Sequence, residues 1–234
     1  MDFPFLVGFN DPSLYLSGYV KVYIILPSTI YGIAAGEFVE QGIQNPYSQQ
    51  VPALIRASLD RGRAGMVGAG KNIWPNVDIE EGKHYIYYHI VCVLIYYSVA
   101  DLYVVLYDSI VANPATGHGR EGIYFGENGE HKLYEVGKAI GEVLVTIGKT
   151  DNPEPTTFTQ EELDKYFRVS YYPRFAPEQV WLWLPKGSSF LGTNSRAAAN
   201  RSRSIGWKPV KTTKDLLASI KPEIAAFIKK SEKA

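Results

Sequence analysis

The stretch YVKVYIILPSTIYG, residues Tyr19–Gly32, decides the fold that we expect for this chain. From Val20 to Leu26 almost every residue is apolar, which is typical of a strand in a sheet covered on both faces. Pro27 is expected to end this strand, because proline lacks the N–H that a sheet ladder needs. The segment PSTIYG then forms a loop at the carboxyl end of the strand, where open α/β sheets bind ligands.

Helical patterns outnumber strand patterns in the rest of the chain. Apolar spacing and capping signals predict helices at Val51–Arg61, at VADLYVVLYDSIVANP before Pro114, at Leu133–Ile147, after Thr159 with Glu162 as a capping box, in a short Ser-capped segment ending at Gly206, and around Pro222 near the C-terminus. GRAGMVGAGKNIWPNVDIEE predicts turns with short extended pieces, and GIYFG a short strand. No internal repeat is present. We therefore expect one α/β domain over residues 1–234.

Bulk composition excludes several classes of protein. The 24 basic and 24 acidic residues balance, so no global field attracts nucleic acid or anionic lipid. A single cysteine excludes an intramolecular disulfide framework and fits a reducing compartment. The N-terminal segment lacks a basic region and is interrupted by Asp2, Pro4 and Asp11, so no signal peptide is expected. These features predict a cytoplasmic protein.

A tyrosine-rich stretch, EEGKHYIYYHIVCVLIYYSVADLY from Glu80 to Tyr103, has three interpretations. Its apolar run, Tyr85–Tyr97, contains His89 and is shorter than the roughly 20 residues that a transmembrane helix needs. Its β-branched and aromatic residues also fit a buried strand. The third interpretation is an insertion, which depends on the rest of the chain.

Familiar nucleotide-binding patterns occur in the wrong context. Gly62, Gly65 and Gly68 spell G-x-x-G-x-x-G but follow a predicted helix, whereas a dinucleotide turn follows a strand and begins a helix. The stretch GMVGAGK is followed by Asn72 where a P-loop needs Ser or Thr. Neither pattern is therefore expected to bind a nucleotide.

Other candidates for chemistry are also weak. Tyr134 and Lys138 spell Y-x-x-x-K, a spacing that lets an ammonium lower the pKa of a phenol. The four histidines show no metal-ligand spacing, so no metal is expected. Cys92 lies in an apolar run that does not activate a thiol. Arginines and lysines between Arg196 and Lys211 form a basic patch that fits either a solvated face or a phosphate site.

Several motifs taken in order resemble the NAD-dependent epimerase/dehydratase family of extended short-chain dehydrogenases/reductases. They are PSTIYG after an apolar strand, VGAGKNIWPNVDIEE, VADLYVVLYDSI, GIYFGENGEHKLYEVGKAIGEVL and SRAAANRSRSIGWKP. The resemblance covers roughly residues 20–79 and 99–234, and it implies part of a Rossmann-like α/β fold with an incomplete parallel sheet and a helix-rich substrate-binding part. It also implies NAD or NADP as the cofactor.

The same resemblance assigns candidate site residues. It places Pro27, Ser28, Thr29 and Tyr31 beside the nicotinamide, where the backbone of this segment helps to hold the carboxamide. It places Asn72, Trp74 and Asn76 in the substrate pocket, and their amide and indole groups suit a polar substrate.

The chain also departs from the family. In the family, the glycines that bind the pyrophosphate and the catalytic Y-x-x-x-K precede the PSTIYG loop, whereas only residues 1–26 precede it here. Tyr134 and Lys138 follow that loop, so we assign no catalytic residue. The expectation is a chain that lacks the family's cofactor-binding half and is inactive alone.

Two segments, residues 82–98 and 168–186, interrupt the resemblance. Removing the first joins VDIEE to VADLY as the family reads, and removing the second joins DKYF to GSSFLGTNSRAAANRS. Gly82-Lys83 and Val169-Ser170 can be encoded by GGTAAG and GTGAGT, which look like intron starts. Translated introns and genuine insertions both remain open.

The functional expectation has two alternatives. The first is a relative of enzymes that act on a small carbonyl or sugar-like substrate. The second is a noncatalytic protein that binds a protein partner through exposed apolar surface, since strand Val20–Leu26 needs neighbours that this chain does not obviously supply. A membrane-associated protein through Tyr85–Tyr97 is a third interpretation.

Overall fold

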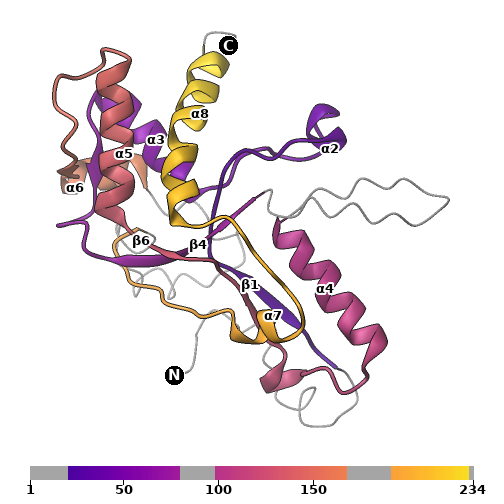
Figure 1. The fold of residues 1–234 in the computed structure, drawn as a ribbon. Helices are drawn as coiled ribbons and strands as arrows, with labels where there is room; N and C mark the ends of the chain where they lie inside the picture. Colours follow the sequence, from indigo (N-terminus) through magenta and orange to yellow (C-terminus); the bar gives the residue numbers. More distant parts are fainter. Residues whose placement is uncertain (1–20, 80–97, 168–190, 232–234) are drawn as a thin grey trace, which may run out of the picture.

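The computed structural model describes residues 21–79, 98–167 and 191–231, and it has the expected α/β class (Figure 1). The elements are β1 (Ile24–Pro27), β2 (Thr29–Tyr31), α2 (Glu37–Glu40), α3 (Gln50–Arg61), β3 (Gly65–Met66), β4 (Ile73–Asp78), α4 (Ser98–Ala112), the 3-10 turn η2 (Gly119–Glu121), β5 (Ile123–Gly126), β6 (Glu130–Lys132), α5 (Leu133–Thr146), β7 (Thr156–Thr157), α6 (Gln160–Tyr166), α7 (Asn200–Ser204) and α8 (Thr213–Ser231).

The opening stretch forms two short strands that meet at a bend. The ladder of β1 begins at Ile24 and runs parallel to β5 as far as the pair Pro27–Gly126. The backbone N–H of Ser28 then donates to the carbonyl of Gly126 at 3.0 Å, and the chain changes its partner from β5 to β4. The expectation that PSTIYG is wholly a loop is therefore wrong for Thr29–Tyr31, which form β2.

Strand β4 is the centre of the largest sheet. It pairs in parallel with β2, with Thr29 opposite Asn76 and Tyr31 opposite Asp78, and it pairs antiparallel with β6. A third small sheet joins β3 to β7 in parallel. Parallel pairing places the carboxyl ends of β2 and β4 at the same edge, which is where the candidate site lies.

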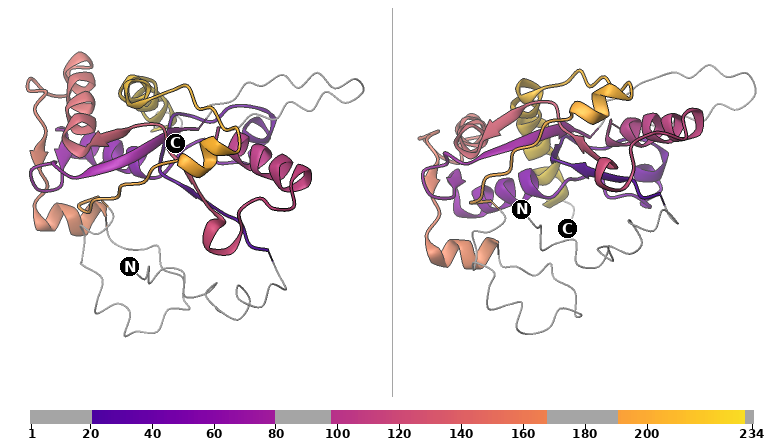
Figure 2. Two further views of the ribbon diagram at one scale, coloured as in Figure 1. Left: turned by 60° about the horizontal axis from the view of Figure 1, so that its bottom comes forward. Right: turned by 90° about the horizontal axis from the view of Figure 1, so that it is seen from below.

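The described residues form two regions around this sheet (Figures 1 and 2). The three-helix region consists of α3, α5 and α8 with α6 beside them. Its buried cluster comprises Tyr31, Val51, Leu54, Ile55, Ala57, Ala64, Leu133, Val136, Ile140, Leu144, Phe158, Leu163, Phe167, Leu191, Leu216, Ile220 and Ile224.

The α4 region consists of α4, β1, β5 and α7. Its buried cluster comprises only Val77, Leu102, Ala199 and Trp207, with Ile25, Ile30, Val105 and Ile205 packed against them as partly buried residues. Figure 2 shows the two regions at opposite ends of the molecule.

Most of the predicted helices are confirmed, with small shifts at their ends. The helix α3 begins one residue earlier than predicted and ends at Gly62, whose φ of 67° closes the helix in the left-handed conformation. The capping box of Thr159 and Glu162 begins α6 as predicted. The predicted serine cap of α7 is wrong, because Ala199 occupies that position.

Most residues of the two predicted insertions lie outside the described ranges. Residues 82–97 of the first proposed insertion, and all of the second at 168–186, lie outside the described residues, as do Cys92 and the apolar run Tyr85–Tyr97. Ser98, the last residue of the first segment, begins α4. Within the described ranges, no helix has the length and hydrophobicity needed to cross a membrane.

Candidate functional site

A small polar pocket, which we call the β2–β4 pocket, lies at the carboxyl ends of these two parallel strands. Its volume is about 230 Å³, and its lining residues are Gly32, Ile33, Asp78, Ile79, Lys211, Asp215 and Ser219. Gly32 and Ile33 follow β2, Asp78 and Ile79 end β4, and the other residues lie at the start of α8 or just before it. The carboxyl edge of parallel strands is the usual ligand-binding edge of an α/β sheet.

The charged core of the pocket is an ion pair between Asp78 and Lys211. The Lys211 Nζ lies 2.8 Å from the Asp78 Oδ1. The Asp78 side chain is only 6% exposed, whereas Lys211 is 41% exposed. The carboxylate is therefore fixed within the protein. The ammonium of Lys211 is more exposed, so its other N–H groups can donate to a ligand in the pocket.

A second carboxyl group, Glu223, lies behind the pocket wall. Its Oε1 accepts hydrogen bonds from the Gly32 backbone N–H at 3.0 Å and from the Ser219 hydroxyl at 2.9 Å. The side chain is fully buried, and its Oε2 has no hydrogen-bond partner. Burial raises the pKa of Glu223 to about 7, with a smaller contribution from the charge of Asp78, whereas the two hydrogen bonds act in the opposite direction.

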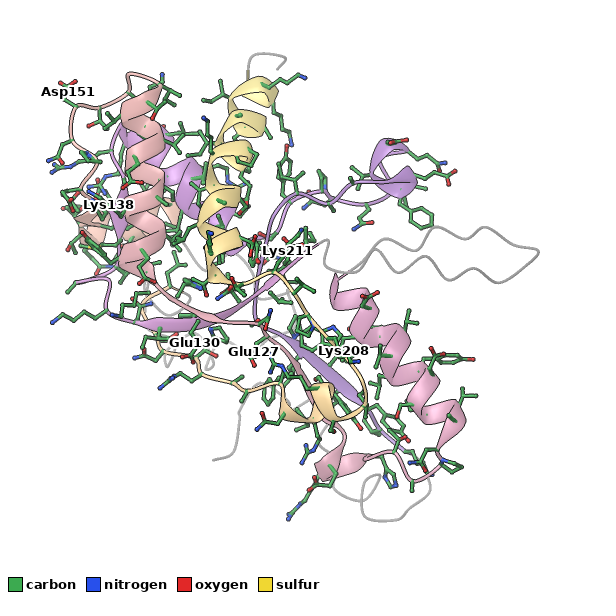
Figure 3. The ribbon with its side chains drawn as sticks, in the orientation of Figure 1. Glu127, Glu130, Lys138, Asp151, Lys208 and Lys211 are labelled. Atoms are coloured by element: carbon green, nitrogen blue, oxygen red, sulfur yellow. The ribbon has the colours of Figure 1, made fainter. Side chains whose placement is uncertain are left out.

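Lys211 is placed by residues 191–212, a segment that contains α7 and that we call the strap. The Tyr31 hydroxyl donates to the carbonyl of Thr212 at 3.0 Å, and the Asn128 side-chain amide donates to the carbonyl of Lys211 at 2.7 Å. These bonds anchor the strap just before α8. Figure 3 shows Lys211 where the strap enters this helix.

The basic patch predicted between Arg196 and Lys211 is largely used to hold the strap in place. Arg196 pairs with Glu130, Arg201 with Glu121, Arg203 with Glu127, and Lys211 with Asp78. Because each of these cations has a carboxylate partner, the structure favours a structural role for the patch over a phosphate site.

The residues assigned to the nicotinamide are engaged with the protein itself. Pro27 ends β1, and both the Ser28 hydroxyl and its N–H donate to the carbonyl of Gly126. The Thr29 hydroxyl donates to Gln50 at 2.5 Å. Tyr31 is fully buried and leads directly into Gly32 at the pocket. These side chains thus stabilise the bend, and the turn that follows it, Gly32–Ile33, lines the pocket.

The residues assigned to the substrate are spread along β4. Asn76 lies opposite Thr29, and its amide nitrogen donates to the Thr213 hydroxyl at 3.0 Å, whereas its Oδ1 is buried without a partner. Asn72 and Trp74 lie at the other end of the strand and donate to strap carbonyls, Asn72 to Leu191 at 2.6 Å and Trp74 to Thr193 at 2.5 Å. None of the three lines the β2–β4 pocket.

Tyr134 and Lys138 do form a cluster, but away from this pocket. The Tyr134 hydroxyl donates to Glu154 Oε2 at 3.0 Å, and Lys138 pairs with Glu154 Oε1. The hydrogen bond to Glu154 raises the pKa of Tyr134, which is opposite to the shift that a catalytic phenol needs. Figure 3 shows Lys138 on α5, apart from Lys211.

The described residues do not fit the pyrophosphate of a dinucleotide. That group needs a glycine-rich turn between a parallel strand and the N-terminus of a helix. Among the described ranges, the passage that comes nearest runs from β2 through Gly32 and Gly36 into α2. This helix has four residues, and Glu37 and Glu40 in its first turn repel phosphate.

Most glycines of the two rejected sequence patterns are turn residues, whereas Gly65 lies in β3. Gly68 and Gly70 have φ values of 54° and 62°, in the left-handed region, and they precede β4 rather than a helix.

His131 is buried, and burial lowers its pKa to about 4. No group of three metal-ligating side chains occurs among the residues described.

No family model matches the chain. A curated relative, the oxidase ucsJ of Acremonium sp, is 28% identical over 205 residues, which cover 87% of this chain and 48% of the relative. The chain thus spans about half the length of the curated relative that it matches.

Solved structures with a similar arrangement include an epimerase and a dehydratase. UDP-N-acetylglucosamine 4-epimerase from Methanobrevibacter ruminantium M1, in complex with UDP-N-acetylmuramic acid, has a TM-score of 0.48 and 12% identity and covers 94% of this chain and 50% of its own. dTDP-glucose 4,6-dehydratase from Bacillus anthracis, in complex with NAD, has a TM-score of 0.45 and 16% identity and covers 93% of this chain and 48% of its own.

Sequence reasoning missed Asp78, Lys211 and Glu223 as a group. One signal was available: Glu223 lies on the same helical stripe as Ile220 and Ile224, at a position where the pattern demands an apolar residue. A carboxyl group on a buried stripe indicates a specific partner. The partner itself, the backbone N–H of Gly32, is 191 positions away and has no sequence signature.

Proposed function

We propose that this chain forms the substrate-side part of an NAD(P)-dependent oxidoreductase or epimerase that acts on a small carbonyl or sugar-like substrate. The observation that carries the proposal is the polar β2–β4 pocket, because it lies at the carboxyl ends of two parallel strands. The oxidase relative supports the oxidoreductase class over most of this chain.

The pocket contains groups that suit such a substrate. Lys211 offers a fixed cation to a carbonyl or hydroxyl oxygen, and Asp78 holds that cation in place. In this proposal, Ser28, Thr29 and Tyr31 shape the turn that faces the nicotinamide, and Pro27 fixes the bend before it. Asn72 and Trp74 fix the strap against β4, and Asn76 holds Thr213 at the start of α8, so these three residues position the segment that carries Lys211.

The second part of the proposal is that the 234-residue chain by itself neither binds the dinucleotide tightly nor turns over substrate. Its support is the poor fit of the described residues to a pyrophosphate, set out above for α2. A nicotinamide cofactor supplies hydride transfer when bound.

The fluorescence of NADH and NADPH tests this part directly. Each reduced cofactor is titrated with the purified chain, and we expect no saturable change in emission. Saturable binding in the micromolar range contradicts the proposal. A dinucleotide-binding dehydrogenase measured in the same buffer is the positive control.

A second candidate function is supported by a specific surface. Tyr103, Tyr107 and Val111 lie at i, i+4 and i+8 on α4, so they share one face, and their side chains are 56%, 66% and 66% exposed. Among the described residues, β1 pairs only with β5, which leaves its other edge without a strand. An exposed apolar stripe and a strand edge of this kind fit a noncatalytic protein that binds a protein partner.

Light scattering coupled to size exclusion tests this alternative. Association that disappears in the double variant Tyr103→Glu, Tyr107→Glu supports it. A clean monomer at all concentrations, with no retention of a candidate partner, counts against it. Asp108→Asn, a charge change on an exposed residue of the same helix, is the matched control.

A further inference from the structure

The β2–β4 pocket carries an excess of negative charge, which restricts what it can bind. Its lining contains two carboxylates, Asp78 and Asp215, and one ammonium, Lys211. The carboxyl group of Glu223 lies directly behind the wall, bonded to the lining residues Gly32 and Ser219. The only cation of the lining is already neutralised by Asp78 at 2.8 Å.

We propose that this pocket selects an uncharged, hydroxyl-bearing group and rejects phosphate and carboxylate groups, with Asp78, Lys211 and Asp215 as the residues that determine this specificity. The inference rests on the proposed function, because it names the chemical class of ligand for the same pocket.

The hydrogen-bonding capacity of the lining explains the preference. A carboxylate only accepts hydrogen bonds, and an ammonium only donates them. A hydroxyl group does both, so a ligand with neighbouring hydroxyls can donate to Asp215 and accept from Lys211 at the same time. A phosphate can donate to these carboxylates only through its acidic O–H group. Its negative charge is also repelled by the negative charge of the carboxylates.

The other polar groups of the wall are occupied and do not alter this balance. The Gly32 N–H donates to Glu223, and the Ser219 hydroxyl bonds to Glu223 and to the carbonyl of Leu216. The Asp215 Oδ2 accepts a hydrogen bond from the Thr212 N–H at 2.8 Å, which fixes the position of this carboxylate in the first turn of α8.

The size of the pocket limits the ligand to one ring-sized group. Its volume of about 230 Å³ is below the range of about 300–1,000 Å³ that drug-sized ligands need. A single polyhydroxylated ring fits such a space, whereas a whole dinucleotide does not. The pocket thus receives one end of a substrate.

The test compares three probes that share one pyranose ring: D-glucose, D-glucuronate and D-glucose 6-phosphate. Their binding to the full chain is measured by ligand-detected saturation-transfer NMR at pH 7 in low salt. We expect glucose to bind. Both anions should bind at least about five-fold more weakly, which is the effect of one like charge about 4 Å away in a site that water can enter. Because salt screens exposed charges, the difference narrows at high ionic strength.

Two variants and a control assign the effect to the pocket. Asp215→Asn keeps an oxygen for the Thr212 N–H and removes one charge, so we expect it to improve the binding of glucose 6-phosphate relative to glucose. Lys211→Gln weakens the binding of glucose. Lys208→Gln, at an exposed position on the same strap, leaves all three probes unchanged. Thermal melts confirm that each variant is folded.

The outcomes separate this inference from the proposed function. If an anion binds as tightly as glucose or more tightly, the charge-based selection is wrong, while a sugar-like substrate for the pocket stands. If no probe binds, the inference and the sugar-like part of the proposed function both fail. If Asp215→Asn does not change the ratio between glucose and its phosphate, the assignment to this lining is overturned.

Discussion

The three-helix region and the α4 region differ in how much apolar surface they bury. In the first, α3, α5 and α8 pack around a large continuous cluster. In the second, four residues form the whole buried cluster, and α4 exposes tyrosines on its outer face. Hydrophobic burial is the main stabilising contribution to folding, so most of the stability is expected to reside in the three-helix region.

Polar contacts occur in both regions, with Arg61 paired to Glu162 and Lys165 to Asp60 in the three-helix region. The α4 region is held by Arg201 with Glu121, by Arg203 with Glu127, and by the Ser202 hydroxyl, which donates to the carbonyl of Phe125 at 2.6 Å. These bonds tie α7 to β5 where few side chains are buried. The comparison teaches that a strap with directional bonds can position a weakly packed part of a sheet.

The largest expected effect comes from emptying each core in turn. Ile140→Ala removes a fully buried side chain from the three-helix region and should lower the free energy of unfolding by about 4 kcal/mol. Leu102→Ala in the α4 region should cost about 2 kcal/mol, because the thinner surroundings can relax into the space. Urea denaturation measures both, and equal losses would remove the distinction between the regions.

The next effect concerns the pH dependence of the three-helix region. The folded-state pKa of Glu223 is raised to about 7, above the ordinary value of 4.5. Between these two pH values, Glu223 is protonated in the folded protein and ionised in the unfolded chain. Stability should therefore fall as pH rises from 4.5 to about 7 and then level off. Glu223→Gln removes this loss, and the difference should reach about 3 kcal/mol above pH 7.

Thermal melts of the wild type and Glu223→Gln across pH 4 to 8 measure this difference. The two curves should converge near pH 4, where the carboxyl group is protonated in both states. Curves that stay parallel over the whole range contradict the assignment. Glu142→Gln, on the exposed side of α5, should reproduce the wild-type curve.

The α4 region should show the opposite pH dependence through Glu127. Burial opposes the ionisation of this carboxyl group, but hydrogen bonds from Arg203 and from the backbone of Ala199 and Gly129 outweigh burial and lower its pKa. Its contribution is therefore present above the ordinary value of 4.5 and is lost as pH falls through the lowered value.

Glu127→Ala should cost about 2 kcal/mol at pH 7, because it leaves Arg203 and two backbone N–H groups without their acceptor. The cost should shrink as pH falls below 4. Amide hydrogen exchange locates the damage, since protection should drop first in α7 and β5. Uniform loss in α3 and α5 would show that the two regions unfold as one unit.

The smallest effect tests a helix cap at the border of the three-helix region. Thr159→Ala removes the hydroxyl that accepts the Glu162 N–H at 3.2 Å and should cost about 1 kcal/mol. Thr159→Ser keeps the hydroxyl and should stay near the wild type. An equal loss in both variants would mean that the methyl group, and not the cap, stabilises α6.

Local patterns allowed much of the fold to be predicted. The apolar spacing of α3 and α5 and the capping box of α6 relate residues that lie three or four positions apart, so they could be identified directly. The strand β2 could not, because Thr29–Tyr31 become a strand only through pairing with Asn76–Asp78. The same is true of β6, whose three residues look like part of a turn.

The candidate site was only partly predictable for the same reason. The sequence indicated the right edge of the sheet through PSTIYG, and the turn after it does line the pocket. The residues chosen from KNIWPNVDIEE lie too early along β4: Asn72 and Trp74 contact the strap, whereas Asp78, two residues beyond Asn76, reaches the cavity. Which residue of a strand meets a pocket depends on register with distant segments.

The hydrogen bond between Glu223 and the Gly32 N–H has a consequence for biosynthesis. Its two partners are separated by 191 positions, so the turn after β2 receives this bond only when α8 has emerged from the ribosome. At the usual translation rates of about 5–20 residues per second, the interval is about 10–40 s. During that time Tyr31 lacks the α8 residues Leu216, Ile220 and Ile224 of its buried cluster, so this aromatic side chain can be bound by chaperones.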